Sequence, residues 1–98
     1  MFTSKERARL RAIASTEDTI MQVGKNGIND NLIKSLSDAL DKREIIKISV
    51  LDNSPDDVKE VGVALAKALK AEFITAIGKK VVLYRYSKKP GIRHIEYN

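Results

Sequence analysis

One stretch of the chain, residues 44–70, decides the fold and reads EIIKISVLDNSPDDVKEVGVALAKALK. In its first part apolar and more polar residues alternate, so Ile46 and Ile48 would point to one side of a strand and Lys47 to the other. In its last part apolar residues recur every three or four positions, as on the buried face of a helix. The stretch therefore predicts a strand over residues 44–50, with one dry and one wetter face, followed by a helix.

The junction between these two elements carries a strong helix start. Ser54-Pro55-Asp56-Asp57 offers a hydroxyl cap, a proline at the first helical position and carboxylates beside the positive end of the helix dipole. Inside the helix, Gly62 costs roughly 1 kcal/mol relative to alanine. This glycine predicts that another group packs closely against the helix backbone at that point.

Further helices and strands are predicted on both sides of this stretch. Thr3 and Glu6 have the spacing of a capping box, so a helix should begin directly after Thr3. Asn29 can cap a second helix, and Gly78 begins a hairpin turn between the last two strands. The other predicted elements are helices over residues 4–15 and 30–42 and strands over residues 19–23, 73–77 and 81–86.

The elements follow the order α-β-α-β-α-β-β, which predicts an α/β fold. Two strand–helix–strand units favour right-handed crossovers and parallel pairing, while the last two strands form an antiparallel hairpin. We therefore expect a mixed four-stranded sheet with the second and third helices packed on it. The first helix has a narrow apolar stripe that buries little, so we expect it near the start of the second helix.

A chain of 98 residues is long enough for one hydrophobic core and too short for two. We expect a single domain over residues 1–98, with an ordered core over about residues 3–88 and a basic C-terminal tail over residues 88–98. The sequence has no cysteine, which excludes disulfides and thiolate metal sites and fits a cytoplasmic protein. No apolar run approaches the roughly 18–20 residues of a membrane span. We expect no membrane partner, and a monomer is the default because the pattern leaves no long exposed apolar stripe.

The residue inventory argues against an enzyme. The one histidine, His94, lies near the C-terminal end, where it is expected to be an ordinary tail residue. Asp56, Asp57 and Glu60 could form an acidic metal cluster, yet all three fall where a helix start attracts negative charge. The sequence contains no nucleophile–base pair and no nucleotide-binding fingerprint. We therefore expect no catalytic residues, no cofactor and no metal.

The positive charge is concentrated at the two ends of the chain. Residues 1–11 contribute +3, residues 12–78 contribute −3 and residues 79–98 contribute +5 to a formal net charge of +5. A fold that juxtaposes the two ends would create one basic face, which attracts phosphate backbones. An acidic protein partner and plain solubility are the alternatives. The basic residues of interest are Lys5, Arg7, Arg9, Arg11, Lys79 and Lys80.

A short glycine loop lies between a predicted strand and a predicted helix. Gly24-Lys25-Asn26-Gly27 has two glycines that permit positive φ angles and let a partner backbone approach closely. Exposed N–H groups near a helix start, with Lys25 beside them, suit a phosphate or the backbone of an RNA strand. The KH fold clamps nucleotide backbones with a GXXG loop of this kind. A purely structural turn is the alternative interpretation.

Three parts of the sequence together carry a resemblance to a known family. They are Val23-Gly24-Lys25-Asn26-Gly27, the basic first helix, and the run IGKKVVLYR over residues 77–85. In register over roughly residues 3–88, they resemble the YhbY-type proteins, which are the bacterial stand-alone form of the CRM (chloroplast RNA splicing and ribosome maturation) domain. The resemblance implies a fold similar to the carboxy-terminal domain of translation initiation factor three.

The resemblance also implies a function and a site. It implies an RNA-binding protein, with no DNA expected, that associates with precursors of the large ribosomal subunit. Gly24, Lys25, Asn26 and Gly27 match the RNA-contacting loop of the family, and the basic residues of the first helix match the surface beside it. The alternatives are a protein-interaction module that docks on an acidic partner and an RNA binder unrelated to the ribosome.

Two aromatic residues of the last predicted strand could add base contacts. Tyr84 and Tyr86 share one face of that strand, so stacking on RNA bases is possible. Tyrosines on a strand ordinarily cover a core, and packing is the role that we expect for both. The sequence does not place Lys79 and Lys80 relative to the glycine loop.

Overall fold

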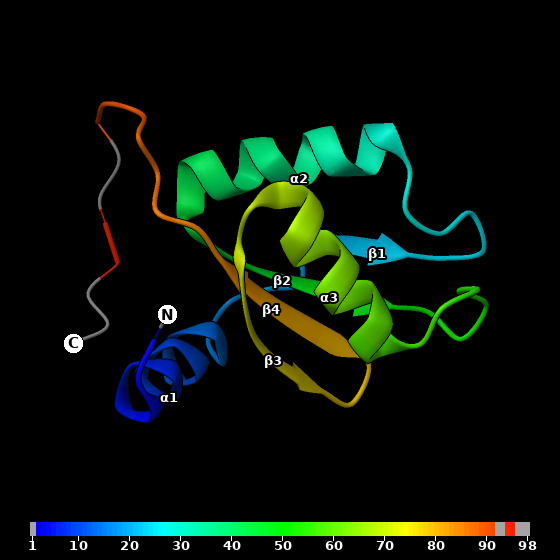
Figure 1. Ribbon diagram of the computed structural model, residues 1–98, viewed down its shortest axis with the longest axis horizontal. Coiled ribbons are helices and arrows are strands. Elements are labelled where there is room, and N and C mark those ends of the chain that lie inside the picture. Colours follow the sequence, from blue (N-terminus) through cyan, green and yellow to red (C-terminus); the bar gives the residue numbers. More distant parts are fainter. Residues whose placement is uncertain (1, 92–93, 96–98) are drawn as a thin grey trace.

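The computed structural model describes residues 2–91 and 94–95, and it contains one four-stranded sheet with helices on both of its faces (Figure 1). The predicted order of elements and the mixed sheet are confirmed. Residues 92–93 and 96–98 of the predicted basic tail lie outside the described residues. The elements are α1 (Ser4–Ala14), β1 (Met21–Val23), α2 (Asp30–Arg43), β2 (Ile45–Val50), α3 (Val58–Leu69), β3 (Glu72–Ile77) and β4 (Lys80–Tyr84).

The strands lie in the order β1-β2-β4-β3. Strand β2 pairs in parallel with β1, with Val23 opposite Val50, and antiparallel with β4, with Ser49 opposite Lys80. Because β1 ends where β4 begins along β2, the loop after β1 and the turn before β4 lie at the same end of the sheet. The edges of the sheet are β1 and β3.

The main core lies between the sheet and the two helices α2 and α3, which cover one face (Figure 1). The predicted alternation in β2 is confirmed, because Ile46 and Ile48 face this core while Lys47 is only partly buried on the other side. The fully buried residues of this core include Leu36, Leu40, Ile46, Ile48, Val61, Leu65, Val81 and Leu83.

Helix α1 packs on the opposite face of the sheet, so the expectation that it lies near the start of the second helix is wrong. Leu10 and Ala14 are buried there in a smaller second core. The sheet has apolar side chains on both faces, and this second set would be left in water without a cover. The narrow stripe of α1 is wide enough to cover it. The sheet residues in the second core are Ile45, Ile74, Val82 and Tyr84.

Helix α3 begins later than the sequence predicts. Its cap is Asp57, whose carboxylate accepts a hydrogen bond from the Glu60 N–H at 2.8 Å, and not Ser54. The Ser54 hydroxyl instead donates to the Asp56 carbonyl within the loop, at 2.9 Å. Pro55 therefore lies in the β2–α3 loop (residues 51–57) and not in the helix. The carboxylates of Asp56, Asp57 and Glu60 lie around the start of α3, where negative charge is favourable. The charge of Asp57 is the largest of the causes that raise the pKa of Glu60.

The start of the tail is fastened to a buried carboxylate that the sequence analysis missed. Glu44 follows α2 with a φ of 63° and has no exposed surface. Its carboxylate accepts hydrogen bonds from the Ser87 N–H at 2.7 Å, from His94 Nδ1 at 2.7 Å and from the Ile95 N–H at 2.8 Å. Burial alone would raise the pKa of Glu44, but these donors outweigh it and the pKa is lowered from 4.5. His94 thus has a defined partner within the fold.

Gly62 meets the close contact that the sequence predicts. A Cβ atom at this position would lie 2.8 Å from Cε2 of Phe73 and 3.1 Å from Cγ1 of Val81. Both neighbours belong to the sheet, so the missing side chain lets α3 approach the sheet directly. Glycine lowers helix stability at this position. It is nevertheless favoured because a side chain would occupy the space where α3 contacts the sheet.

Gly62→Ala is expected to lower the free energy of unfolding by up to about 2 kcal/mol. Overpacking costs about 1–3 kcal/mol, of which the better helix propensity of alanine returns roughly 1 kcal/mol. Urea denaturation of Gly62→Ala, with and without Phe73→Leu, measures the effect. The loss should be smaller in the Phe73→Leu background, and an alanine variant as stable as the parent would show that the contact is not tight.

Glu44→Gln is expected to destabilise the protein at pH 7 by about 1–3 kcal/mol, because buried donors lose a charged acceptor. The pKa of Glu44 is lowered in the folded state, so its contribution is complete above the ordinary value of 4.5 and is lost as the pH falls through the folded value. The difference between parent and variant should therefore shrink below about pH 4.5. Asp38→Asn, at an exposed position of α2, is the control and should show no such pattern in thermal unfolding from pH 3 to 7.

Candidate nucleic-acid interface

The glycine loop forms a tight turn between β1 and α2. The Gly27 N–H donates to the Gly24 carbonyl at 2.9 Å, and Gly27 has a φ of 63°, which favours glycine. Lys25 and Asn26 are exposed at the tip of the turn. Asn29 then caps α2 by accepting a hydrogen bond from the Leu32 N–H at 2.9 Å. The turn thus presents one cation and one amide to solvent.

Both glycines also make room for the neighbouring β2–α3 loop. A Cβ atom at Gly27 would lie 3.2 Å from Cγ of Pro55, and one at Gly24 would lie 3.4 Å from Oδ1 of Asn53. The β2–α3 loop therefore lies directly against the glycine loop.

The turn between β3 and β4 meets the same loop from the other side. The Val50 N–H donates to the Lys79 carbonyl at 2.7 Å, and the next amide, of Leu51, donates to the Val23 carbonyl at 2.8 Å. The Lys79 ammonium forms an ion pair with the exposed carboxylate of Asp52. We call this region, formed by residues 24–29, 51–57 and 78–79, the three-loop end. It brings Lys79 to the same end of the sheet as Lys25.

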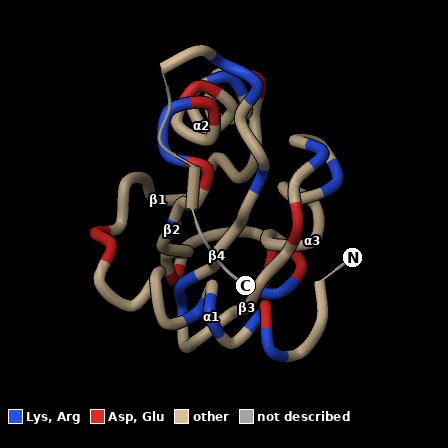
Figure 2. The backbone as a smooth tube through the Cα atoms, turned by 90° about the vertical axis from the view of Figure 1, so that its left-hand side faces the viewer, with Lys and Arg blue, Asp and Glu red and all other residues tan. Residues whose placement is uncertain are grey.

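The basic residues of α1 do not lie beside the glycine loop, which corrects the expectation of one continuous surface formed with Lys25. Helix α1 packs near the other end of the sheet and on the face opposite α2 and α3 (Figure 1). Figure 2 shows Lys and Arg positions both along α1 and around α2, on opposite sides of the sheet. Lys5, Arg9 and Arg11 are exposed on α1.

Arg7, one of the predicted RNA-contacting residues, is used inside the fold. Its guanidinium donates to the carbonyls of Phe73 and Ile74 at 2.6 and 3.2 Å, and it lies 3.6 Å from the carboxylate of Glu72. These bonds join α1 to the outer edge of β3. Arg7 is therefore a structural residue in this conformation, and its charge is partly compensated.

Arg85, from the run over residues 77–85, is also used inside the fold. Its guanidinium donates to the Leu69 carbonyl at 2.9 Å, to the Ser37 carbonyl at 2.9 Å and to the Asp41 carboxylate at 3.0 Å. It thereby connects β4 to the ends of α2 and α3. The number of cations open to a partner is smaller than the sequence count indicates.

The two tyrosines have different surroundings. Tyr84 is buried, and its ring lies 5.4 Å from that of Phe2 in an edge-to-face contact, which confirms its packing role. Tyr86 lies beyond the end of β4 and is 57% exposed. Its ring stacks on His94 with centroids 4.3 Å apart. The expectation that both tyrosines cover a core holds for Tyr84 and is wrong for Tyr86.

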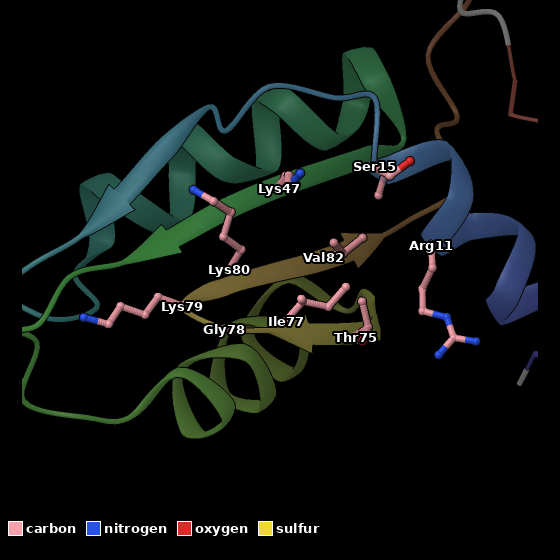
Figure 3. Close-up of a pocket in the computed structure, with 10 residues that line it drawn as sticks. Arg11, Ser15, Lys47, Thr75, Ile77, Gly78, Lys79, Lys80 and Val82 are labelled. Atoms are coloured by element: carbon pink, nitrogen blue, oxygen red, sulfur yellow. The ribbon is translucent and has the colours of Figure 1, made fainter.

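A hollow of about 410 Å³ on the α1 side of the sheet was not foreseen (Figure 3). It lies between the end of α1 and the β3–β4 turn, and it brings Arg11 and Lys80 to a common site. The alternation in β2 was the available signal, because it places Lys47 on this face. Its lining includes Arg11, Ser15, Lys47, Thr75, Ile77, Lys80 and Val82.

Among residues 2–91 and 94–95, no group of three or more His, Cys, Asp or Glu side chains is placed to hold a metal ion. No helix in the described part of the chain is both long and apolar enough to cross a membrane.

Comparisons with known proteins identify the family of this chain. The CRS1 / YhbY (CRM) domain model matches residues 2–85. The chain is 44% identical over 89 residues to the probable RNA-binding protein YqeI of Bacillus subtilis, covering 91% of this chain and 93% of that one. It is 25% identical over 92 residues to an RNA-binding protein of Haemophilus influenzae, covering 94% and 93% of the two chains.

A solved structure has the same fold. It is the solution structure of the hypothetical protein SAV1595 from Staphylococcus aureus, with a TM-score of 0.81, 43% identity and full coverage of both chains. The family model spans the glycine loop and the β3–β4 turn, the two blocks that the fold brings to one end of the sheet. This chain belongs to the CRS1 / YhbY (CRM) domain family.

Proposed function

We propose that this protein binds RNA through the three-loop end and the basic side chains beside it, and that it has no catalytic activity of its own. We further propose that it acts in the cytoplasm and that its RNA belongs to the precursor of the large ribosomal subunit. The first part is supported by relatives that are named as RNA-binding proteins. The ribosomal part extends the family resemblance of the sequence.

One observation carries the proposal. The adjacent amides of Val50 and Leu51 bond to the β3–β4 turn on one side and to the end of β1 on the other. Two sequence blocks that lie about fifty residues apart are thereby fixed next to each other. The packing of the main core does not require either turn to carry lysine. A shared surface for a polyanion accounts for both.

The physical basis of binding is neutralisation of phosphates by a few cations on a rigid scaffold. Lys25 at the tip of the glycine turn and Lys79 in the hairpin turn can each meet the RNA backbone. Each neutralised phosphate of a single strand lowers the slope of log affinity against log salt by about 0.7. Four contacts, from Lys25, Lys79, Lys80 and Arg11, would give a slope near −3.

Lys25→Glu is expected to weaken RNA binding about tenfold at low salt, because it replaces an attractive charge by a repulsive one. Asp52→Asn should have the opposite effect, since it releases Lys79 from its ion pair. Lys67→Glu is the matched control, because it makes the same charge change on the exposed side of α3. Fluorescence anisotropy with labelled single-stranded RNA at several salt concentrations gives the affinities and slopes.

Circular dichroism must show that each variant is folded. Equal affinities for Lys25→Glu and Lys67→Glu would mean that only net charge matters, and that the three-loop end is not the site. An undiminished affinity in both would contradict the proposal. Pull-down of a protein partner after nuclease treatment would favour the alternative of an acidic protein.

The ribosomal part has its own test in cells. Sucrose-gradient fractionation of a lysate at low salt should show the protein with free or precursor large subunits, and high salt should release it, because the contacts are electrostatic. Lys25→Glu should shift the protein to the top of the gradient at low salt as well. Migration of the unaltered protein at the top in both salts would remove the ribosomal assignment and leave a general RNA binder.

A further inference from the structure

The hollow on the α1 side of the sheet is enclosed by defined secondary-structure elements. It is bounded by the end of α1 and by the β3–β4 turn, and its floor is the open part of β2, β4 and β3 (Figure 3). Helix α1 covers the rest of this face, where Leu10 and Ala14 lie against the second core. The hollow is therefore the part of the face that the chain leaves uncovered.

A β-bulge aims two side chains into the hollow. The pairing of β3 with β4 shifts between Phe73 and Thr75, so Phe73 lies opposite Leu83 whereas Thr75 lies opposite Val82. Directly paired residues point to the same side of a sheet, and Val82 belongs to the α1 side. Without the extra residue, Thr75 and Ile77 would point to the main core. Bulges often re-aim side chains next to functional sites in this way.

The charges around the hollow are all of one sign. Arg11 comes from α1, Lys47 from β2 and Lys80 from β4, and the lining contains no Asp or Glu. In the described part of the chain, no ion pair involves any of these three cations. Lys80 makes one hydrogen bond, from Nζ to the Thr19 hydroxyl at 3.2 Å. Figure 3 shows Arg11 at the α1 end of the hollow and Lys80 at the end near the β3–β4 turn, with the Lys80 side chain directed toward β1 and Lys79 pointing away.

The floor of the hollow is apolar, and Ile77 is the part of it that is open to solvent. Ile77 is 66% exposed, whereas Val82 beside it is 3% exposed and belongs to the second core. The volume of about 410 Å³ is near the lower end of the roughly 300–1,000 Å³ that small-ligand sites have. An exposed apolar side chain in a hollow lined by cations has the chemistry of a site for one nucleotide.

We propose that this hollow takes a single unpaired nucleotide of the bound RNA. Its base lies on the exposed Ile77, and the phosphates on either side meet Arg11 and Lys80. The inference rests on the proposed RNA binding and adds to it a preference for single-stranded over duplex RNA, because a paired base cannot leave its stack to enter the hollow without added cost. An acidic peptide would satisfy the cations but would leave the apolar floor without a partner.

The test uses the full chain and two defined probes, a single-stranded uridine hexamer and a blunt RNA duplex. Ile77→Ser should weaken binding of the hexamer about five- to tenfold without changing the salt slope, since it removes apolar contact and no charge. Arg11→Ala should make the slope shallower by about 0.7, because it removes one phosphate contact. Val63→Ser, at a 51% exposed position on α3, is the control for Ile77→Ser. In ¹⁵N-labelled protein, the hexamer should shift the amide resonances of Lys47, Thr75, Ile77 and Val82.

The outcomes separate this inference from the proposed function. If Ile77→Ser and Arg11→Ala bind like the parent while Lys25→Glu does not, RNA binding stands and the nucleotide site is wrong. Equal binding of duplex and hexamer, with no shifts in the hollow, also overturns it. If neither RNA binds, both proposals fail. Stronger shifts in the hollow with polyglutamate than with the hexamer would assign it to a protein partner instead.

Discussion

Hydrogen bonding along both edges of β2 is the constraint on which the rest of the structure depends. This strand pairs in parallel with β1 and antiparallel with β4. A parallel neighbour that ends and an antiparallel neighbour that begins must meet at one end of the shared strand. The glycine loop and the β3–β4 turn are therefore neighbours through the pairing rules of the sheet, with no direct attraction between them needed. The β2–α3 loop, held by Gly27 and Pro55, fills the space between them.

The cations of this protein divide into those that hold the fold and those that remain open. Arg7 bonds to two carbonyls of the edge strand β3, and Arg85 bonds to groups on α2 and α3. Charge-assisted hydrogen bonds of this kind are stronger than neutral ones, so loss of either arginine would affect folding. Weak RNA binding by an Arg7 variant would thus be no evidence of contact. Arginines that are bonded within the fold add to the net charge but are not open to a polyanion, so the net charge overstates the attraction.

Local signals in the sequence predicted the elements well, because capping and periodicity are properties of neighbouring residues. Asn29 caps α2 as predicted, and Gly62 meets a close contact as predicted. The placement of α1 could not be predicted, because its narrow stripe fits any small apolar patch and the second face of the sheet exists only after the strands pair. The true start of α3 was missed because Ser54 and Asp57 both offer a side-chain cap, and only the structure shows that Asp57 is the one used.

The candidate site was predictable only in part, for the same reason. Gly24-Lys25-Asn26-Gly27 is contiguous, so its turn and exposed lysine follow from the sequence. Glu44 is the first residue of a predicted strand. No neighbouring residue in the sequence indicates that its carboxylate is buried and bonded to the amides of Ser87 and Ile95. The hollow depends on a β-bulge in β3, and the residue types of that strand do not predict the bulge.

The part of the α1 face that stays uncovered is apolar, and the cations around it oppose association with another chain. Exposed apolar residues beside an edge strand invite pairing with another chain. Long basic side chains reduce this risk, because their stems cover apolar surface while their charges repel a second copy. Arg11, Lys47 and Lys80 surround Ile77 and Val82 in this arrangement, and Arg7 occupies carbonyls on the open edge of β3. The cations that disfavour pairing with a second copy are also those that attract a polyanion, so the proposed RNA binding does not conflict with protection of this face.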